Sequence, residues 1–323
     1  MSLFENIFDL SKKAKASRLA FGEKIAALGD EESKIVVLDG DLSKSTRTDL
    51  FAAKFPDRFF NMGIAEANMI GVAAGLARSG KIPFAASFGC FLTGRFDQIR
   101  MSVSFTGARV TLVGTHAGVG IGEDGHSQMA LEDLALMRIL PGMKVFQPAD
   151  ESDTLQIIDF LVKSNDSPAY LRLTRQNLCP IKNKTALKVG EWEFLNTAKA
   201  SKNVAIVATG GVLEAAVKAA DILISSGKFS EATIVNAQWI EPVAELNIDK
   251  ILTTKPELIV SVEDHYPQGG LGGVLAERLS NRASAPKLLR IGVEGFGQSG
   301  SPEVNYQKYG FTPEAIAEKI SRA

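Results

Sequence analysis

A glycine-rich segment from Val113 to Gln128 gathers residue types that can bind and transform a ligand. It holds two of the three histidines, His116 and His126, and an adjacent pair of acids, Glu123 and Asp124. Its glycines allow the backbone to turn sharply and to approach a ligand closely. The apolar run before it predicts a buried strand, and open α/β sheets bind ligands at the carboxyl ends of such strands. We therefore expect a ligand site here, although a polar loop that merely caps its neighbours would have the same composition.

Glu66 is the only charged residue between Gly63 and Ala77. The pattern around it predicts a helix that is apolar nearly all round and therefore buried on all sides. A carboxylate is costly to bury unless another group pairs with it. Two interpretations stay open: the helix N-terminus stabilises the charge, or Glu66 holds a ring nitrogen of a ligand in one protonation state.

The elements that must position these residues alternate between strands and helices. Strand-like runs are predicted at 34–41, 58–63, 82–88, 109–114, 144–147 and 169–173, and later at 203–210, 232–237, 258–262 and 287–291. Helical patterns lie between them, with clear examples at 14–29, 213–226, 272–279 and 312–320. Such alternation predicts right-handed crossovers and parallel sheets covered by helices.

The fold class is therefore α/β, with two domains that each contain a mostly parallel β-sheet flanked by helices. The chain of 323 residues is longer than a usual single domain. The regular pattern breaks in a polar, lysine-containing stretch around Pro180. We predict a first domain at 1–180, a linker at 181–200 and a smaller second domain at 201–323.

Composition excludes several classes of function. The net charge is −1 and there is no basic tract, so nucleic acid and membrane surfaces are not expected partners. No apolar stretch reaches the ~18 residues of a membrane span, and the amino terminus lacks the apolar core of a secretory signal. Two cysteines are too few for a disulfide framework or a cysteine-based zinc site. We expect a cytoplasmic protein that binds small molecules or other proteins.

Several stretches resemble the pyrimidine-binding domain of transketolase. They are Ile64-Ala-Glu-Ala-Asn-Met69, Ala86-Ser-Phe-Gly-Cys-Phe91, Arg95-Phe-Asp-Gln-Ile-Arg-Met101, Leu173-Thr-Arg-Gln-Asn177 and Gly120-Ile-Gly-Glu-Asp-Gly-His-Ser-Gln-Met-Ala-Leu-Glu-Asp-Leu-Ala135. Near the other end, Val262-Glu-Asp-His-Tyr-Pro-Gln-Gly-Gly-Leu-Gly272 resembles the carboxyl-terminal domain of the same family. The resemblance covers nearly the whole chain.

The resemblance implies thiamine diphosphate chemistry. Glu66 would hydrogen-bond the aminopyrimidine ring and favour the imino tautomer that removes the thiazolium proton, so it is a catalytic and a cofactor-binding candidate. Phe88 and Phe91 would form an aromatic pocket around the pyrimidine, and Asp41 is a further cofactor-binding candidate. Taken alone, two phenylalanines three apart on a helix face usually fill a core.

The same resemblance implies the sugar contacts within the glycine-rich segment. His116 would contact the donor ketose near its carbonyl and assist proton transfer. Asp124 would bind the hydroxyl that fixes stereochemistry, and Gln128 would hydrogen-bond the reacting sugar. Two positions depart from the family: His126 stands where proline is expected, and Gly94 stands where some relatives have an aromatic residue. His265, in the second domain, is left as a structural or interfacial histidine.

Arg18, Ser45 and Arg175 match the family's sugar-phosphate contacts. Guanidinium groups bind phosphate bidentately, so two converging arginines would set both affinity and reach. Without the resemblance, each arginine would be read as a surface residue.

The resemblance also indicates what this chain lacks. A whole transketolase carries a diphosphate-binding domain with a Gly-Asp-Gly motif and a distal asparagine for its metal, and the nearest string here, Asp39-Gly-Asp41, does not match. We expect no metal ligand in this chain, with Mg²⁺ (or Ca²⁺) held by a separate diphosphate-binding subunit. The predicted assembly is α2β2 with self-association, and the helix of Glu66 and residues 88–100 would contribute to the interface.

The main prediction is a split transketolase that moves a two-carbon ketol unit between sugar phosphates. Three alternatives were weighed. A 2-oxo acid dehydrogenase β subunit has less reason to combine His116, Asp124 and two arginines, and the Gly-Glu-Asp-Gly string favours transketolase over a deoxyxylulose-phosphate synthase. A catalytically silent regulatory subunit is opposed, though not excluded, by the intact Glu66, His116 and Asp124.

Overall fold

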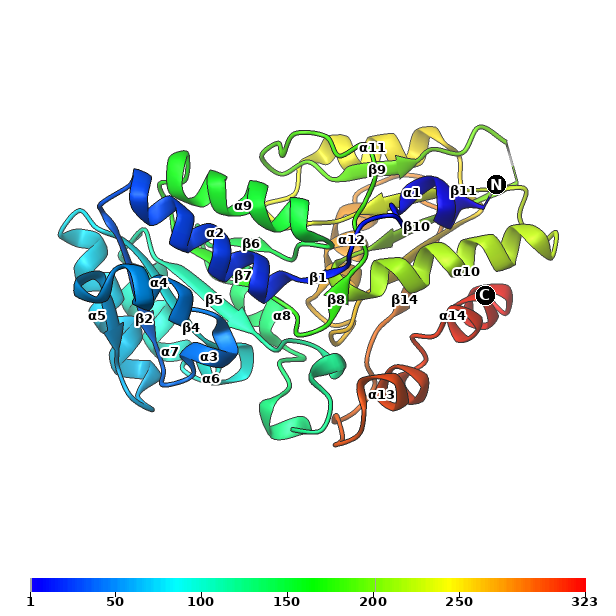
Figure 1. The fold of residues 1–323 in the computed structure, drawn as a ribbon. Coiled ribbons are helices and arrows are strands. Elements are labelled where there is room, and N and C mark those ends of the chain that lie inside the picture. Colours follow the sequence, from blue (N-terminus) through cyan, green and yellow to red (C-terminus); the bar gives the residue numbers. More distant parts are fainter. Residues whose placement is uncertain (1, 201) are drawn as a thin grey trace.

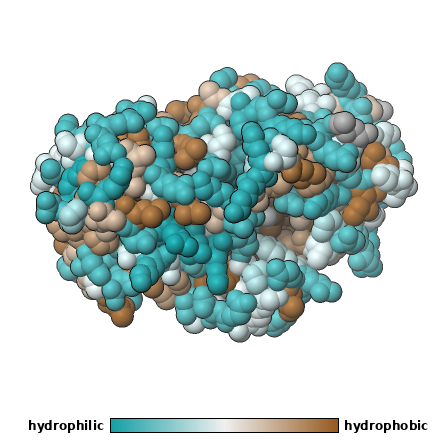
Figure 2. Space-filling model, in the orientation of Figure 1, coloured by the Kyte–Doolittle hydropathy of each residue, from teal (hydrophilic) through white to brown (hydrophobic). Residues whose placement is uncertain are grey.

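The structure, a computed structural model, describes residues 2–200 and 202–323. The chain forms two lobes that lie side by side, each built on its own β-sheet (Figure 1). The predicted α/β class with mostly parallel sheets is confirmed. On the face drawn in Figure 2, hydrophilic residues predominate and hydrophobic ones form smaller groups. In the described part of the chain, no helix combines the length and the apolar character needed to cross a membrane.

The first lobe contains a seven-stranded sheet in the order β12-β6-β7-β5-β4-β2-β3. Its strands are β2 (Ile35–Asp39), β3 (Phe59–Asn61), β4 (Ile82–Phe88), β5 (Thr111–Thr115), β6 (Lys144–Phe146), β7 (Ala169–Arg172) and β12 (Trp239–Glu241). All neighbouring strands are parallel except β12, which pairs antiparallel with β6. Every residue of β2, β4, β5 and β7 is buried, as expected for parallel strands covered on both faces.

The helices of this lobe are α2 (Ser17–Glu31), α3 (Ser43–Thr46), α4 (Asp49–Lys54), α5 (Glu66–Arg78), α6 (Gly89–Thr93), α7 (Phe96–Gln98), α8 (Asp133–Arg138) and α9 (Glu151–Lys163). Helices α2 and α9 pack side by side on one face of the sheet (Figure 1). Short helical turns occur at Pro56–Arg58, Ile99–Ser104, Val119–Ile121 and His126–Gln128.

The second lobe contains a five-stranded sheet in the order β14-β13-β10-β11-β9. Its strands are β9 (Glu193–Asn196), β10 (Asn203–Ala208), β11 (Glu231–Asn236), β13 (Leu258–Val262) and β14 (Lys287–Ile291), and only β9 is antiparallel to its neighbour. The helices are α10 (Leu213–Ser225, after a turn at Gly210–Val212), α11 (Glu245–Thr253), α12 (Leu271–Ser280), α13 (Pro302–Tyr309) and α14 (Pro313–Ser321).

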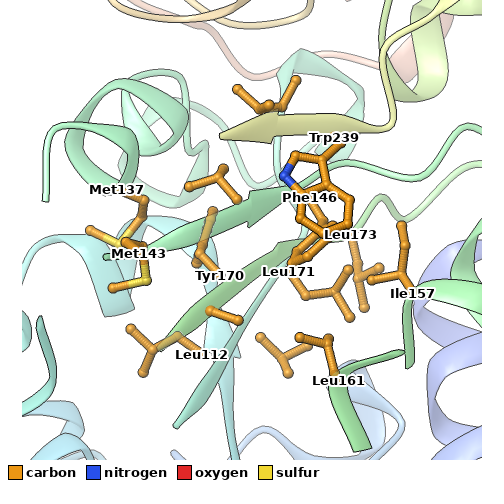
Figure 3. Packing of buried hydrophobic residues seen from close by; sticks show 14 of the residues in the cluster. Leu112, Met137, Met143, Phe146, Ile157, Leu161, Tyr170, Leu171, Leu173 and Trp239 are labelled. Atoms are coloured by element: carbon orange, nitrogen blue, oxygen red, sulfur yellow. The ribbon is translucent and has the colours of Figure 1, made fainter. Parts of the chain in front are cut away.

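Strand β12 follows the second lobe's first two parallel strands in sequence but lies in the first lobe's sheet. Its Trp239 is fully buried, and its ring meets that of Phe146 edge-on at 4.5 Å between centroids and that of Phe160 at 5.2 Å. Figure 3 shows Trp239 over Phe146 among the side chains of this core. The core of the first lobe therefore includes residues that follow β11 in the sequence.

The amino terminus also crosses between the lobes. Helix α1 (Leu3–Ile7) packs on α10 of the second lobe, where the backbone N–H groups of Leu3 and Phe4 donate to the Asp221 carboxylate at 2.7 and 3.0 Å. Strand β1 (Lys15–Ala16) then pairs with β8 (Asn177–Leu178) just before α2 begins. The first residues thus tie the two lobes together (Figure 1).

A buried ion network joins the lobes beneath the glycine-rich segment. The Arg172 guanidinium, at the end of β7, donates to the Asp133 carboxylate at 2.9 Å and to Asp264 Oδ1 at 2.7 Å. All three side chains are fully buried. Asp264 lies two residues after β13, so Arg172 contacts the carboxyl end of a strand in the second sheet. Removing one member would leave a buried charge unpaired, so breaking this network should destabilise the contact between the lobes.

Candidate functional site

Glu66 is the first residue of α5, and its side chain is 5% exposed. Ser87, in β4, donates its hydroxyl to Glu66 Oε1 at 3.0 Å. Among the described residues, no lysine or arginine forms an ion pair with this carboxylate. A Cβ at Gly40 would lie 3.2 Å from Glu66 Oε1 and 3.3 Å from Ser87 Oγ, so glycine lets the backbone pass close to the acid. Glu66 is thus a buried carboxylate whose hydrogen-bond partner among the described residues is a neutral hydroxyl.

The prediction that the Glu66 helix is buried on all sides is wrong for this chain. Its inner face, which includes Met69 and Ile70, is buried, but Val72 is 36% exposed and Ile64, just before the helix, is 87% exposed. Within the described residues, these apolar side chains of the outer face lie at the surface.

Phe88 and Phe91 lie together, although they come from two elements and not from one helix face. Phe88 ends strand β4 and Phe91 lies in α6, because the chain turns from strand to helix at Gly89. Their rings are stacked, with centroids 5.5 Å apart and planes 10° apart. Phe88 also stacks on His116 at 4.0 Å. This aromatic group therefore links the residues after β4 with those after β5.

His116 follows β5 and is almost fully buried, with a left-handed backbone φ of 58°. Thr115 donates its hydroxyl to the Ser87 carbonyl, so its oxygen is free to accept the Nδ1–H of His116 at 2.9 Å. Arg18 Nη1 lies 3.2 Å from His116 Nε2, and because guanidinium nitrogens only donate, Nε2 accepts. Burial, together with the charges of Arg18 and Arg175, lowers the pKa of His116 to about 3. His116 is therefore a neutral imidazole.

The structure brings Arg18, Ser45 and Arg175 near His116. Arg18 Nη1 donates to the Ser45 carbonyl at 2.6 Å, and Arg175 Nη1 donates to the Ile121 carbonyl at 2.8 Å. Burial, together with the positive charges of Arg47 and Arg175, lowers the pKa of Arg18 to about 10. Sequence reasoning did not identify Arg47, although it stands only two positions after Ser45.

The other predicted site residues lie on loops at the same edge of the sheet. Asp124 is 41% exposed and lies 4.0 Å from Arg175 Nη1. Gln128 ends a helical turn and is half-buried. Asp41, the residue after Gly40, has a left-handed backbone φ of 67°. Its carboxylate accepts a hydrogen bond from the Asn61 side chain at 2.9 Å. In the described part of the chain, no group of three or more histidine, cysteine or acidic side chains could hold a metal ion.

The second lobe supports the glycine-rich segment, which lies beside α13 (Figure 1). Asn305 donates to the Val119 carbonyl at 3.2 Å, and the Gly297 N–H donates to His126 Nδ1 at 3.1 Å. The His126 ring also meets the exposed Phe296 ring edge-on at 4.7 Å. These contacts give His126 a structural partner that the sequence did not reveal, because the partner lies about 170 positions away.

Two glycines show how tightly this support is packed. A side chain at Gly118 would collide with the Asp264 carboxylate, and one at Gly120 would collide with Gln176 and Tyr306. His265, the histidine expected to be structural or interfacial, is fully buried. Its ring accepts a hydrogen bond from the Ala135 N–H at 3.4 Å and donates one to the Tyr266 carbonyl at 2.6 Å. Burial lowers its pKa to about 4.

Comparison with known proteins places this site in a family. Residues 13–180 match the family model described as "Transketolase, pyrimidine binding domain", and residues 193–316 match "Transketolase, C-terminal domain". A protein of Methanocaldococcus jannaschii described as a transketolase C-terminal section is 40% identical over 316 residues, which are 96% of this chain and 97% of that protein.

Human transketolase is 33% identical over 308 residues, which are 94% of this chain but 48% of the human protein, so the chain spans about half of its length. A solved structure titled "Split gene transketolase, inactive beta4 tetramer" superimposes with a TM-score of 0.83 at 38% identity and covers 96% of this chain and 98% of that chain. The chain belongs to the transketolase family and contains its pyrimidine-binding and carboxyl-terminal domains.

Proposed function

We propose that this chain is the pyrimidine-side subunit of a split transketolase, which transfers a two-carbon ketol unit from a ketose phosphate to an aldose or aldose phosphate. The single observation that carries the proposal is the buried Glu66 carboxylate, whose partner among the described residues is the Ser87 hydroxyl and not a cation. The nearly full-length match to a split gene transketolase supports it. None of the relatives reported above is a 2-oxo acid dehydrogenase or a deoxyxylulose-phosphate synthase, so neither alternative is proposed.

The residues fit thiamine diphosphate on one side only. Glu66 would hold the aminopyrimidine, the Phe88 and Phe91 rings would contact it, and Asp41 lies on the neighbouring turn. When bound, the cofactor supplies the nucleophilic carbon and the electron sink for ketol transfer. Glu66 would keep a proton on the pyrimidine ring nitrogen, and its burial would strengthen that hydrogen bond.

The remaining residues would bind the sugar. Neutral His116 carries a lone pair on Nε2, which accepts from Arg18 Nη1 at 3.2 Å. Once the phosphate of the sugar engages Arg18, a sugar hydroxyl would exchange a proton with this nitrogen. Asp124 and Gln128 would bind hydroxyl groups of the sugar. Arg18, Arg175 and the Ser45 region would hold the phosphate, since guanidinium groups match phosphate oxygens in geometry and charge.

We infer that a separate subunit holds Mg²⁺ (or Ca²⁺) and the diphosphate in an α2β2 assembly. The exposed outer face of the Glu66 helix, with Ile64 and Val72, supports a partner surface there, because apolar groups at a surface favour association. We also propose a cytoplasmic location, which fits the two free cysteines, Cys90 and Cys179.

The test replaces Glu66 with glutamine in the complex reconstituted with the diphosphate-binding subunit. Glu66→Gln keeps the shape but removes the charge that stabilises the protonated pyrimidine nitrogen, so we expect ketol transfer to fall at least about a hundredfold. The exposed Glu31 at the end of α2 supplies a matched control, since Glu31→Gln should leave the rate unchanged. A Glu66→Gln complex with an unchanged rate would remove Glu66 from the mechanism.

A further inference from the structure

Arg47 is the residue on which α3 ends, and its backbone is left-handed with a φ of 69°. A residue with a side chain rarely adopts this conformation unless its surroundings impose it. Here the neighbours impose it: Thr46 and Thr48 both donate their hydroxyls to the buried Asp39 carboxylate, at 2.7 and 2.8 Å. These two hydrogen bonds hold the backbone on both sides of Arg47.

The backbone of Arg47 packs against Gly22 of helix α2, one helical turn after Arg18. A Cβ added to Gly22 would collide with the Arg47 carbonyl oxygen and would lie 2.6 Å from Arg47 Cβ. Gly22 and Arg18 are four residues apart on α2, so they share one face and lie roughly 6 Å apart. Arg18 in turn donates to the carbonyl of Ser45, two residues before Arg47. Both arginines thus start from the same junction of α2 and α3.

Among the described residues, carboxylates balance only part of the positive charge of this cluster. Within the described residues, the Arg47 side chain forms no hydrogen bond or ion pair, and the Nε atoms of Arg47 and Arg18 are buried without a partner. The carboxylates of Glu123 and Asp124 lie only at 3.8 and 4.0 Å from Arg175 Nη1. The charge of Arg47 also contributes to the lowered pKa of Arg18, which shows that the two guanidinium groups act on each other.

We propose that Arg47 is a third guanidinium group of the phosphate-binding cluster, beside Arg18 and Arg175, and that it sets the preference for a doubly charged phosphate group. Two arginines offer a bidentate grip, and a third adds charge that favours the dianion over a singly charged or uncharged group. The inference rests on the proposed function, because it assumes that the phosphate of a sugar substrate binds here.

The experiment measures binding of inorganic phosphate to the purified full chain by calorimetry, because all three arginines belong to this chain. Loss of one charged hydrogen-bond donor in Arg47→Gln should raise the phosphate Kd about tenfold. Arg47→Lys, which keeps the charge but not the fork of donors, should restore part of the affinity. Lys44→Gln removes an exposed positive charge from the same short helix and should leave the Kd within about twofold.

A second measurement uses the reconstituted complex with ribose 5-phosphate and with free ribose as acceptors. Arg47→Gln should raise the KM for ribose 5-phosphate about tenfold while leaving its kcat and the KM for ribose unchanged. If Arg47→Gln binds phosphate like the original chain, or Lys44→Gln weakens binding equally, Arg47 has no such role. If the original chain binds no phosphate, the phosphate site of the proposed function fails with it.

Discussion

The proposed chemistry depends on two buried groups with different partners. Glu66 has a hydroxyl as its partner, and His116 lies between the Thr115 hydroxyl and the Arg18 guanidinium. A carboxylate without a cation would gain from a ring nitrogen of the cofactor, and the charge of Arg18 beside His116 would gain from a phosphate. The two residues would therefore serve different parts of the bound ligands.

The charge state of His116 can be tested directly. Burial and the positive charges of Arg18 and Arg175 together lower its pKa to about 3, so His116 should stay neutral from about pH 5 to about pH 8. Removing Arg18 takes away a repulsion that acts only on the protonated ring, so Arg18→Gln should raise the pKa of His116. The measurement is an NMR titration of the labelled imidazoles, which is tractable because the chain has three histidines. A wild-type His116 that titrates near pH 6.5 would contradict this reading.

At the scale of elements, the glycine-rich segment owes its shape to the second lobe. Asn305, Gly297 and Phe296 contact it from the chain around α13, and Asp264 fills the space that Gly118 leaves. The residues of the segment would follow a different path without these contacts, since five glycines do not fix a backbone by themselves.

The contact between Phe296 and His126 should matter for binding more than for folding. Phe296 is 80% exposed, so Phe296→Ala removes almost no apolar surface from a core. The free energy of unfolding should therefore change by less than about 0.5 kcal/mol. It should nevertheless raise the KM for the sugar severalfold, because the segment loses a ring contact that holds it in place. Val304→Ala, at an exposed apolar residue of α13, is the control. Equal KM values for the two variants would count against a role for Phe296.

The packing of Gly118 against Asp264 gives a sharper test of stability. Gly118 and Gly107 both have positive φ, at 83° and 63°, but a side chain at Gly107 would meet open space. Gly107→Ala should therefore cost only the backbone term of about 1–2 kcal/mol. Gly118→Ala should cost about 1–3 kcal/mol more, because it also forces a side chain into the buried Asp264 carboxylate. Denaturant unfolding of both variants measures the difference, and equal losses would show that the lobes yield at this contact.

At the scale of the whole molecule, the sequence predicted the central strands well and the crossing segments poorly. The predicted bounds of β4, β13 and β14 match the structure. β4 and β13 are mostly apolar and fully buried, so their ends are clear in the sequence, whereas β14 carries Lys287 and Arg290 and is partly exposed. β9 and β12 were missed, since each is a short segment with a charged residue and is stabilised only by a distant neighbour. For β9, that neighbour is β11, and the strand lies inside the stretch predicted as a linker.

The same distinction applies to the site. Sequence patterns singled out Glu66 and His116 because a lone acid in an apolar helix and a histidine on a glycine-rich loop are locally visible. Ser87 and Arg47 gave no such signal, since a serine in a strand and an arginine after a short helix are ordinary residues. Their importance comes from what the fold brings next to them, the carboxylate of Glu66 and the junction with α2.

The position of β12 limits how the chain can be divided or recombined. A fragment that stops at residue 180 would keep the family's pyrimidine-binding region but leave the edge of β6 unpaired and Phe146 without its indole neighbour. Open strand edges recruit other strands, so such a fragment should precipitate rather than fold cleanly. A chimaera that exchanges the second unit would have to import a Trp-Ile-Glu strand of the same register. Although it contains two sheets, the polypeptide should therefore fold and be exchanged as one unit.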